Sequence, residues 1–510
     1  MAVSTFAAID VGSYNVMMEI FEVRRSGLRS LTTLRRRLLL GRDTYSDHRI
    51  SMDSLNELTR ILKDYADAMK EYGVSAYRAC AKSAFREAGN SMLIVEHVKK
   101  KTGITIDILS NSEQRFLGYK SIASKGEDFA RIIEKGTAIV DVGGGSIQIS
   151  LFDKDTLVTT ANLLLGSLRV SGRLASLENE TEHPDILIDQ LIRKDILNFK
   201  RMYLKDRNID TLILVGDYFT NLIFQNRADM NKFETRDEFL GWYNKVVNMT
   251  SQEAAEYLGV GMEAAHAVLP TAVLYRRLIE VLGASTVWLP GIQLTDGIAY
   301  DYGLEARIIK SSHDFDRDIL TAARNIMKRY AGNKPHTEKI MEISDEIFKA
   351  IRKNNFLSDR DRLLLKVACC LHDCGKYVSL VNVSECSYNI IKSTEIIGLS
   401  ERERMIIANV VKYNTIPFDF HEELSRSIPE EDYLRVAKLT AILRLSNGLD
   451  QSYLQKIEQI KASRKDEKLI IEVAVKEDFT LEKGLFGENV GFFEGIFDVK
   501  PLLKIRKKIS

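Results

Sequence analysis

The chain has 510 residues, of which 45% are apolar and 28% charged, so a disordered or fibrous protein is excluded. Lys and Arg total 72 and Asp and Glu total 71, which excludes a protein whose whole surface binds nucleic acid or membrane. At roughly 150 residues per domain, the length predicts about three or four domains.

The cysteines and the N-terminus favour a cytoplasmic protein. Five cysteines, an odd number, are typical of a reducing compartment and too few for a disulfide framework. Met1 to Phe6 lack the cationic start and apolar core of a signal peptide. No stretch reaches the roughly 20 apolar residues of a membrane helix. We therefore expect no membrane partner and no nucleic-acid partner.

The first part of the chain alternates strands with helices, as periodicity and turn residues predict. A strand–turn–strand unit is expected at 5–22, and a second one at 137–152. Between and after them we expect helices at 53–71, after Asn90 and at 184–205, and strands near 76–81 and at 211–215.

The second strand–turn–strand unit repeats the first. Asp10 and Gly12 correspond to Asp141 and Gly143, and the apolar residues that follow alternate in the same phase. Chance similarity of two hairpins is the alternative, but it does not explain the agreement of Asp, Gly and phase.

The character of the chain changes at 305–315, where strands give way to long amphipathic helices. An alternating segment at 469–475 opens a small mixed tail. The predicted domains are two α/β domains at 1–124 and 125–307, a helical domain at 308–462 and a small α/β domain at 463–510.

The two turns have residues suited to binding phosphate. Gly12 and the run Gly143–Gly145 allow positive φ and close approach of a ligand, and successive amides can form an anion nest. Asp10 and Asp141 end the preceding strands and can hold a divalent cation. One such loop is more often only a hairpin. Two facing loops would form a clamp for phosphate and Mg²⁺ between two related domains.

These motifs resemble the exopolyphosphatase and guanosine pentaphosphate phosphohydrolase (Ppx/GppA) family of the sugar kinase/Hsp70/actin superfold. Its members have two actin-like α/β domains, ribonuclease H-like in topology, and the long members add an all-α HD-like domain and a small α/β tail. The first part matches in AAIDVGSYN (7–15), LLLGRD (38–43), ACAKSAFREAGN (79–90), ILSNSEQRFLGY (108–119), VDVGGGSIQIS (140–150), LLLGSLRVS (163–171) and LVGDYFTNL (214–222). The second part matches through HTEKIMEISDEIF (336–348), LHDCGK (371–376), 390–414 and ILRLSNGLDQS (442–452).

The resemblance implies release of a terminal phosphate from inorganic polyphosphate, or of the 5′-phosphate from guanosine pentaphosphate, by Mg²⁺-assisted attack of water. It also implies a homodimer. Asp10 and Asp141 would hold Mg²⁺, and Arg86 would donate to a phosphate oxygen unless it only pairs with Glu87. The other implied phosphate-binding residues are Gly12, Ser13, Asn15, Gly143, Gly144, Gly145 and Ser146.

Two expected glutamates are replaced. The position of the family's water-activating base is Gln114, preceded by Glu113, and the glutamate that follows GGGS-T in the family is Gln148 here. Glutamine cannot take a proton from water as a carboxylate does, and loss of a general base typically removes a factor of about 10² to 10⁴ in rate. An alignment shifted by one residue would make Glu113 the base.

Two of the phosphate loops also carry aromatic residues. Tyr14 narrows the first loop, and Tyr218 and Phe219 replace small residues in the third, which keeps Gly216 and Thr220. These rings could block a phosphate or stack on a base.

The HD-like part keeps His336, His372 and Asp373, which fit the first metal ligands of an HD site, with the last ligand near Asn447 or Asp450. The alternative is a hydrogen-bonded remnant that holds the helices together.

Three functions remain open. The first is a Mg²⁺-dependent phosphohydrolase, in which Asp141, Glu113, Gln114 and Gln148 line the reacting centre. The second is a binding protein that senses polyphosphate or an alarmone without turnover. The third is phosphotransfer to a nucleoside diphosphate, which no residue here selects.

Overall fold

The computed structural model describes residues 4–507 apart from 126, 155, 176, 178–182, 216–231, 260, 312, 419 and 421–427. The described chain forms two compact units, Met1–Asp314 and Phe315–Ser510. The division lies within the composition shift at 305–315.

The first sheet of the first unit has the strand order β3-β2-β1-β4-β5. β1 and β2 form the expected antiparallel hairpin, and β4 runs parallel to β1. The strands are β1 (Ser4–Val11), β2 (Asn15–Arg24), β3 (Gly27–Arg37), β4 (Ala76–Ala81) and β5 (Ile106–Ile108). The helices of this part are α1 (Leu40–Asp47), α2 (Met52–Glu71), α3 (Ser83–Glu87), α4 (Ser91–Thr102) and α5 (Asn111–Ala123).

The second sheet repeats this order. Its strands run β8-β7-β6-β9-β11, with β10 added at the edge, so β6, β7, β8, β9 and β11 take the places of β1, β2, β3, β4 and β5. The strands are β6 (Thr137–Val142), β7 (Ile147–Asp153), β8 (Thr156–Leu163), β9 (Thr211–Val215), β10 (Lys232–Thr235) and β11 (Thr286–Leu289). The predicted internal repeat is therefore present in the fold.

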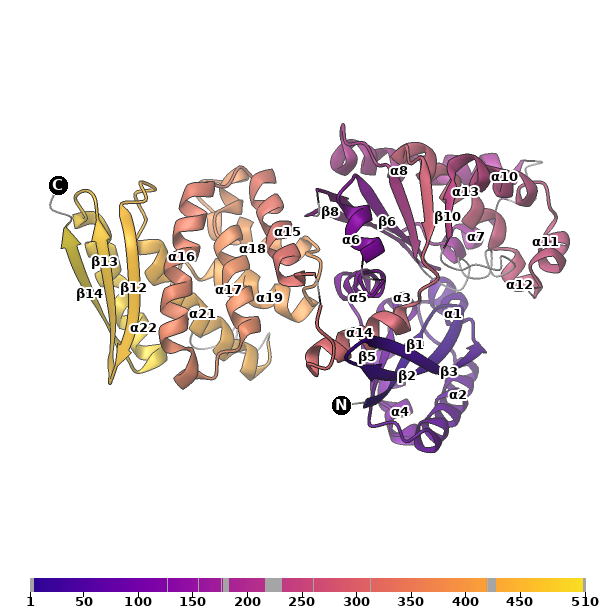
Figure 1. The fold of residues 1–510 in the computed structure, drawn as a ribbon, viewed down its shortest axis with the longest axis horizontal. Coiled ribbons are helices and arrows are strands. Elements are labelled where there is room, and N and C mark those ends of the chain that lie inside the picture. Colours follow the sequence, from indigo (N-terminus) through magenta and orange to yellow (C-terminus); the bar gives the residue numbers. More distant parts are fainter. Residues whose placement is uncertain are drawn as a thin grey trace. The chain divides into compact units, whose positions relative to one another are not determined.

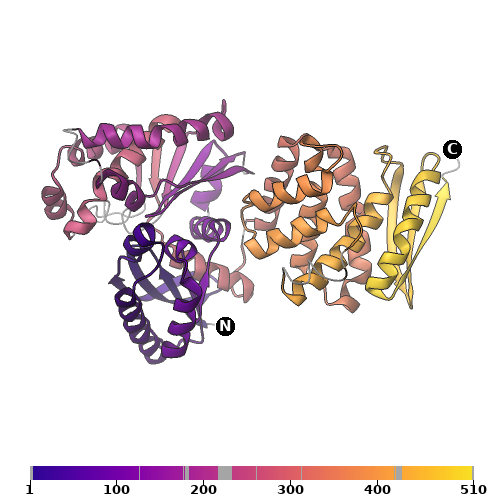
Figure 2. The ribbon, with the colours of Figure 1, turned by 180° about the vertical axis from the view of Figure 1, so that it is seen from behind.

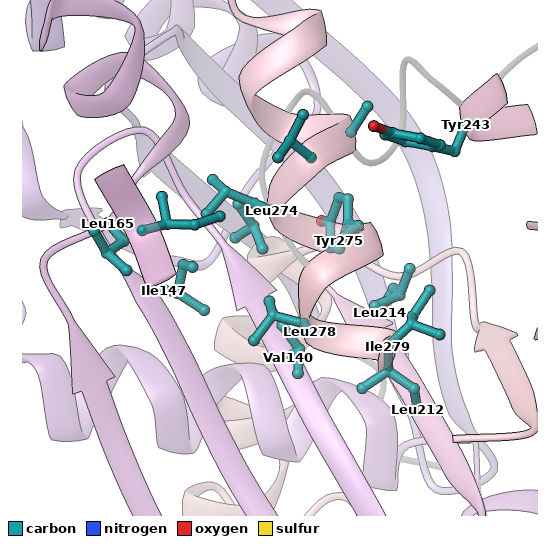
Figure 3. Close-up of a cluster of buried hydrophobic side chains, with 14 of the residues drawn as sticks. Val140, Ile147, Leu165, Leu212, Leu214, Tyr243, Leu274, Tyr275, Leu278 and Ile279 are labelled. Carbon is teal, nitrogen blue, oxygen red and sulfur yellow. The ribbon is translucent and has the colours of Figure 1, made fainter. Parts of the chain in front are cut away.

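Helices cover the second sheet and bury its apolar face. Val140 of β6 lies against Leu278 of α13, and Leu212 and Leu214 of β9 lie against Ile279 (Figure 3). The helices are α6 (Glu127–Ile133), α7 (Ser167–Ala175), α8 (Pro184–Phe199) with a π-helical end at Lys200–Leu204, α10 (Arg236–Val246), α11 (Ser251–Leu258), α12 (Met262–Ala265) and α13 (Val268–Leu282).

The last helix of the unit, α14 (Leu294–Glu305), returns to the first sheet. It packs on β1 and α5, and Tyr302 stacks on Phe6 with ring centroids 4.1 Å apart. A Cβ at Gly297 would overlap the carbonyl of Leu117, so the glycine allows this close packing. α14 therefore lies in the expected second domain (125–307) by sequence but packs on elements of the expected first domain.

The second unit is a helical bundle followed by a three-stranded sheet (Figure 1). α17 packs on α15, α16 and α19, and α22 contacts both α21 and β14, as seen from behind in Figure 2. The helices are α15 (Phe315–Arg329), α16 (Lys334–Ile351), α17 (Asp359–Leu371), α18 (Val383–Ser393), α19 (Glu401–Lys412), α21 (Glu430–Gly448) and α22 (Thr480–Phe497), with 3₁₀ turns at Arg352–Asn355 and Cys374–Tyr377. The sheet contains β12 (Ile457–Lys465), β13 (Lys468–Val475) and β14 (Lys500–Lys507), so it begins before the expected boundary at 463.

Among the described residues, no helix is both long enough and apolar enough to cross a membrane.

Candidate functional site

The two phosphate loops have the same backbone turn. In the first, the amide of Gly12 donates to the carbonyl of Asn15 at 2.9 Å, and in the second, the amide of Gly143 donates to Ser146 at 2.9 Å. Each turn joins two antiparallel strands directly after an aspartate. The equivalent turns place Asp10 and Asp141 at the same point of their sheets.

A cluster of three hydroxyl groups lies against the second loop. Tyr45 Oη is 2.9 Å from Ser13 Oγ and 2.7 Å from Ser83 Oγ. A Cβ at Gly145 would collide with the Tyr45 hydroxyl and lie 3.0 Å from Ser83 Oγ, so only glycine permits this approach. The first loop, α1 and the start of α3 therefore supply hydroxyl donors directly beside the glycine run.

Tyr14 crosses from the first loop into the core of the second half. Its side chain is 2% exposed and packs with the apolar cluster under the second sheet. Its hydroxyl lies 2.8 Å from Ser167 Oγ at the start of α7. Tyr14 therefore joins the first loop to α7 and the core of the second half, and its narrowing of the loop stays a prediction.

The start of α7 holds the second loop through its carbonyls. Ser167 N donates to Gly143 O and Leu168 N to Gly144 O, each at 3.0 Å. In contrast, the amides of Gly144, Gly145 and Ser146 donate to no acceptor within the described part of the chain. Consecutive amides of this kind form a nest for an anion.

Arg169 ties this loop to the first half. Its Nε donates to Gly145 O at 2.9 Å, and its Nη2 pairs with Glu87 at 2.6 Å. Glu87 therefore pairs with Arg169, whereas the sequence had offered it as the alternative partner of Arg86.

Lys82, which the sequence did not single out, reaches Asp10. β4 runs parallel to β1 and brings residue 82 next to the first loop, where Lys82 Nζ lies 3.0 Å from Asp10 Oδ2. Both side chains are under a tenth exposed, at 8% and 9%. A Cβ at Gly12 would lie 3.5 Å from the same Nζ. The only early sign was a lysine directly after a predicted strand, in the string that contains Arg86.

The surroundings of Asp10 do not fit a Mg²⁺ ion. A divalent cation needs the carboxylate oxygens, and a buried ammonium on the same carboxylate would repel it strongly at low dielectric. Asp141 is only half-buried at the end of β6, and its carboxylate suits Mg²⁺ better.

Gln148 faces Asp141 across the second hairpin, where β6 and β7 pair these two residues directly. Gln148 is 2% exposed, and neither its amide oxygen nor its nitrogen has a hydrogen-bond partner among the described residues. Most buried polar groups are hydrogen-bonded, so this amide is a candidate to bind a polar group of a ligand.

Arg86 contacts the start of α5 and the residues just before it. Arg86 donates to Leu109 O at 2.6 Å and to Asn111 Oδ1 at 2.5 Å, and its Nη1 lies 3.4 Å from Gln114 Oε1. The structure thus brings together the two side chains that the sequence assigned to phosphate binding and to the missing base.

Glu113 has a different part. Its carboxylate accepts from the amide and the hydroxyl of Ser110, at 2.9 and 2.7 Å, and so completes a capping box at the start of α5. Glu113 was the expected replacement for the absent base, but its carboxylate already accepts the hydrogen bonds that cap α5. The capping-box pattern, Ser with Glu three residues later, was readable in the sequence.

The third phosphate loop lies outside the described residues, and with it Gly216, Tyr218, Phe219 and Thr220.

A second polar cluster lies in the second unit. The nearest ligand atoms of His336, His372 and Asp373 lie within 4.8 Å of one another. His336 Nδ1 bonds to Asp450 Oδ2 and His372 Nδ1 to Cys369 O, each at 2.8 Å. Because both partners can only accept, each neutral ring carries its lone pair on Nε2.

These two Nε2 atoms are buried and neither makes a well-aligned hydrogen bond among the described residues, although His372 Nε2 lies 3.3 Å from Asp373 Oδ2. Burial alone would raise the pKa of Asp373, but the adjacent His372 imidazole and the hydrogen bonds from Lys376 and Tyr453 hold this pKa well below its usual range. Two imidazole nitrogens and a carboxylate suit Zn²⁺ or a related ion, with Asp450 orienting His336. Lys376, 2.8 Å from Asp373, is the feature that opposes a metal.

Two family models match the two units of the chain separately. A model of the Ppx/GppA phosphatase family matches residues 19–306, and a model of domain III of Ppx/GppA phosphatases matches residues 320–491. A Ppx/GppA family member from Aquifex aeolicus is 20% identical over 61% of this chain and 100% of its own, with a TM-score of 0.51. An exopolyphosphatase from Cytophaga hutchinsonii is 15% identical over 61% of this chain and 100% of its own, with a TM-score of 0.53.

These two solved structures share the fold of this chain over the parts that they match. The family models together span most of both units. The chain therefore belongs to the Ppx/GppA phosphatase family, which places it among the phosphoanhydride hydrolases.

Proposed function

We propose that the first unit releases terminal phosphate from inorganic polyphosphate, or the 5′-phosphate from guanosine pentaphosphate, by attack of water. The observation that carries the proposal is the meeting of the two phosphate loops, where the amides of Gly144 and Gly145 lie beside the hydroxyls of Ser13, Tyr45 and Ser83. Such converging donors hold phosphate oxygens. The name of the exopolyphosphatase from Cytophaga hutchinsonii supports polyphosphate as the substrate class.

In this proposal the chain acts by positioning and by neutralising charge, which are the main means of catalysing phosphoryl transfer. The amides of Gly144, Gly145 and Ser146 receive the terminal phosphoryl group. Arg86 turns part of its fork of donors from Asn111 to a phosphate oxygen. Mg²⁺ is proposed at Asp141 alone, where it would supply charge neutralisation at the phosphate.

Turnover is expected to be slow. Gln114 can orient a water molecule through its amide but cannot accept its proton, and Glu113 serves the helix cap. A binding protein that senses phosphate chains or an alarmone is the second candidate. The buried amide of Gln148 opposite Asp141 favours it, because an amide can hydrogen-bond to a ligand but cannot act as a base.

The test measures phosphate release from long-chain polyphosphate with Mg²⁺, and binding of the same chain, for the natural protein and Asp141→Asn. We expect slow release that Asp141→Asn abolishes. Binding without release would select the binding protein instead, and absence of both would contradict the proposal. Mass measurement in solution tests the homodimer, which stays a prediction.

We further propose that His336, His372 and Asp373 bind one transition-metal ion, with Zn²⁺ favoured by two nitrogen ligands and one oxygen ligand. The support is the pair of buried Nε2 atoms that make no hydrogen bond among the described residues, one of them 3.3 Å from the Asp373 carboxylate. At a Zn²⁺ concentration 100 times the dissociation constant, binding should stabilise the folded state by about 2.7 kcal/mol.

Thermal unfolding with Zn²⁺ and with a chelator checks this prediction. His372→Gln should remove the difference between the two conditions, while His313→Gln, a histidine of the first unit, should keep it. Equal unfolding temperatures with Zn²⁺ and with chelator would leave the cluster as a hydrogen-bonded remnant.

A further inference from the structure

The first phosphate loop contains a fixed positive charge where its aspartate was expected to hold a metal. Lys82 Nζ lies 3.0 Å from Asp10 Oδ2, with the two side chains 8% and 9% exposed. The same ammonium lies over the turn, since a Cβ at Gly12 would be 3.5 Å from it. The charge is therefore next to both the carboxylate and the loop backbone.

The backbone pairing of β1 and β4 places Lys82 beside the loop. Asp10 pairs with Cys80 in the parallel register of β1 and β4, and Lys82 N donates to Val11 O at 3.4 Å just beyond that pair. The lysine side chain is buried, and both its Cε and its Nζ lie beside Gly12 of the loop. Asp10 and Lys82 are thus held together by strand pairing and not by a flexible surface contact.

An ammonium group and Mg²⁺ satisfy a buried carboxylate differently. Mg²⁺ requires near-octahedral oxygen ligands and usually keeps several waters, whereas an ammonium needs only hydrogen-bond acceptors and no extra water. A lysine is also a common binder of phosphate as a point charge. With Lys82 in place, the first loop already has the cation that a phosphate chain needs.

We propose that Lys82 takes the place of a protein-bound Mg²⁺ ion at the first phosphate loop, so that the chain binds a phosphate chain without a metal ion on Asp10. The inference rests on the proposed function for its ligand but not for its metal prediction. The two loops then differ in their cation. In the first loop Lys82 neutralises the Asp10 carboxylate, and only the second loop binds Mg²⁺.

The metal prediction is tested without substrate, by counting bound Mn²⁺ with electron paramagnetic resonance. Every protein carries His372→Gln, which removes the cluster of the second unit. We expect the protein with Lys82→Met to bind one more Mn²⁺ ion than the parent protein, which carries His372→Gln alone. Adding Asp10→Asn to Lys82→Met should remove that ion. Lys120→Met is the matched control, because Lys120 also forms a buried ion pair, with Asp301, but lies outside the loops.

The phosphate prediction is tested by calorimetric titration with tripolyphosphate. In EDTA the natural protein should bind it, and Lys82→Met should bind at least about tenfold more weakly, as loss of a charged hydrogen bond predicts. Mg²⁺ should restore most of that loss in Lys82→Met. Lys82→Arg keeps the charge and should retain binding in EDTA, which distinguishes a charge effect from misfolding.

The outcomes separate the two claims. A parent protein that binds a Mn²⁺ ion removed by Asp10→Asn would overturn the role of Lys82, whatever the phosphate result. Failure of the natural protein to bind tripolyphosphate in either condition would contradict the proposed function, while the Mn²⁺ count would still decide the role of Lys82.

Discussion

Asp10 and Asp141 are the last residues but one of equivalent strands, yet the residues paired with them across the two hairpins differ. Met17 lies opposite Asp10, whereas Gln148 lies opposite Asp141. Met17 is apolar and 3% exposed, and Gln148 is a buried amide without a partner in the described chain. The two turns have the same backbone form, but the aspartate faces an apolar residue in the first loop and a polar residue in the second.

The third residue of the turn also differs between the two loops. The first loop has Tyr14, which fills the core of the second half, and the second has Gly145, which leaves room for the Tyr45 hydroxyl. The first loop is therefore fixed by packing and by Lys82, while the second keeps its amides for a ligand. Repetition of a fold unit does not repeat its chemistry, which depends on the side chains placed on it.

Removing Tyr14 should give the largest effect. Tyr14→Ala deletes a buried ring and should lower the free energy of unfolding by about 3 to 5 kcal/mol, since the cavity adds to the lost transfer free energy. Tyr14→Phe keeps the ring, loses only the contact with Ser167, and should cost about 1 kcal/mol. Urea denaturation checks both. Equal costs for the two variants would show that the ring does not pack as described.

Gln148→Met makes the second hairpin like the first and should change stability in the opposite direction. A buried amide without partners costs about 1 to 3 kcal/mol, so its removal should leave the free energy of unfolding unchanged or raise it by about 1 kcal/mol. The same variant should weaken binding of a phosphate chain. A loss of more than about 2 kcal/mol in stability would mean that Gln148 is satisfied in the free protein.

Glu87→Gln should have the smallest effect. The pair of Glu87 with Arg169 is partly exposed, at 32% and 20%, and such pairs contribute about 0.2 to 1 kcal/mol. The loss should shrink in high salt, because screening weakens the natural pair. Arg169 keeps its bond to Gly145, so the second loop should retain phosphate binding in titrations. Loss of binding would show that the ion pair itself sets the loop.

The elements and the repeat were predictable because they depend on local pattern. Alternation set the hairpins, and helical spacing set α2 (Met52–Glu71) and the helices of the second unit. Gly12 and Gly143 marked the two turns in the sequence, although neither they nor Gly144 and Gly145 have the positive φ that was expected there. These features need no knowledge of distant contacts.

The rest depended on pairings between distant residues. Lys82 reaches Asp10 only because β4 lies beside β1. α14 packs on the first sheet although it follows the second sheet in sequence. The partner of Tyr14, Ser167, lies in the other half of the unit. Neither periodicity nor a motif contains such information.

The central claim is that the phosphate loops are intact and the general base is absent. Phosphate release from long-chain polyphosphate, compared among the natural protein, Gln114→Glu and Glu113→Gln, tests it most directly. We predict at least about a tenfold gain for Gln114→Glu, because a carboxylate then faces the water beside Arg86, and no change in rate for Glu113→Gln. Loss of activity in Glu113→Gln, with no gain in Gln114→Glu and unchanged folding of both, would contradict the claim.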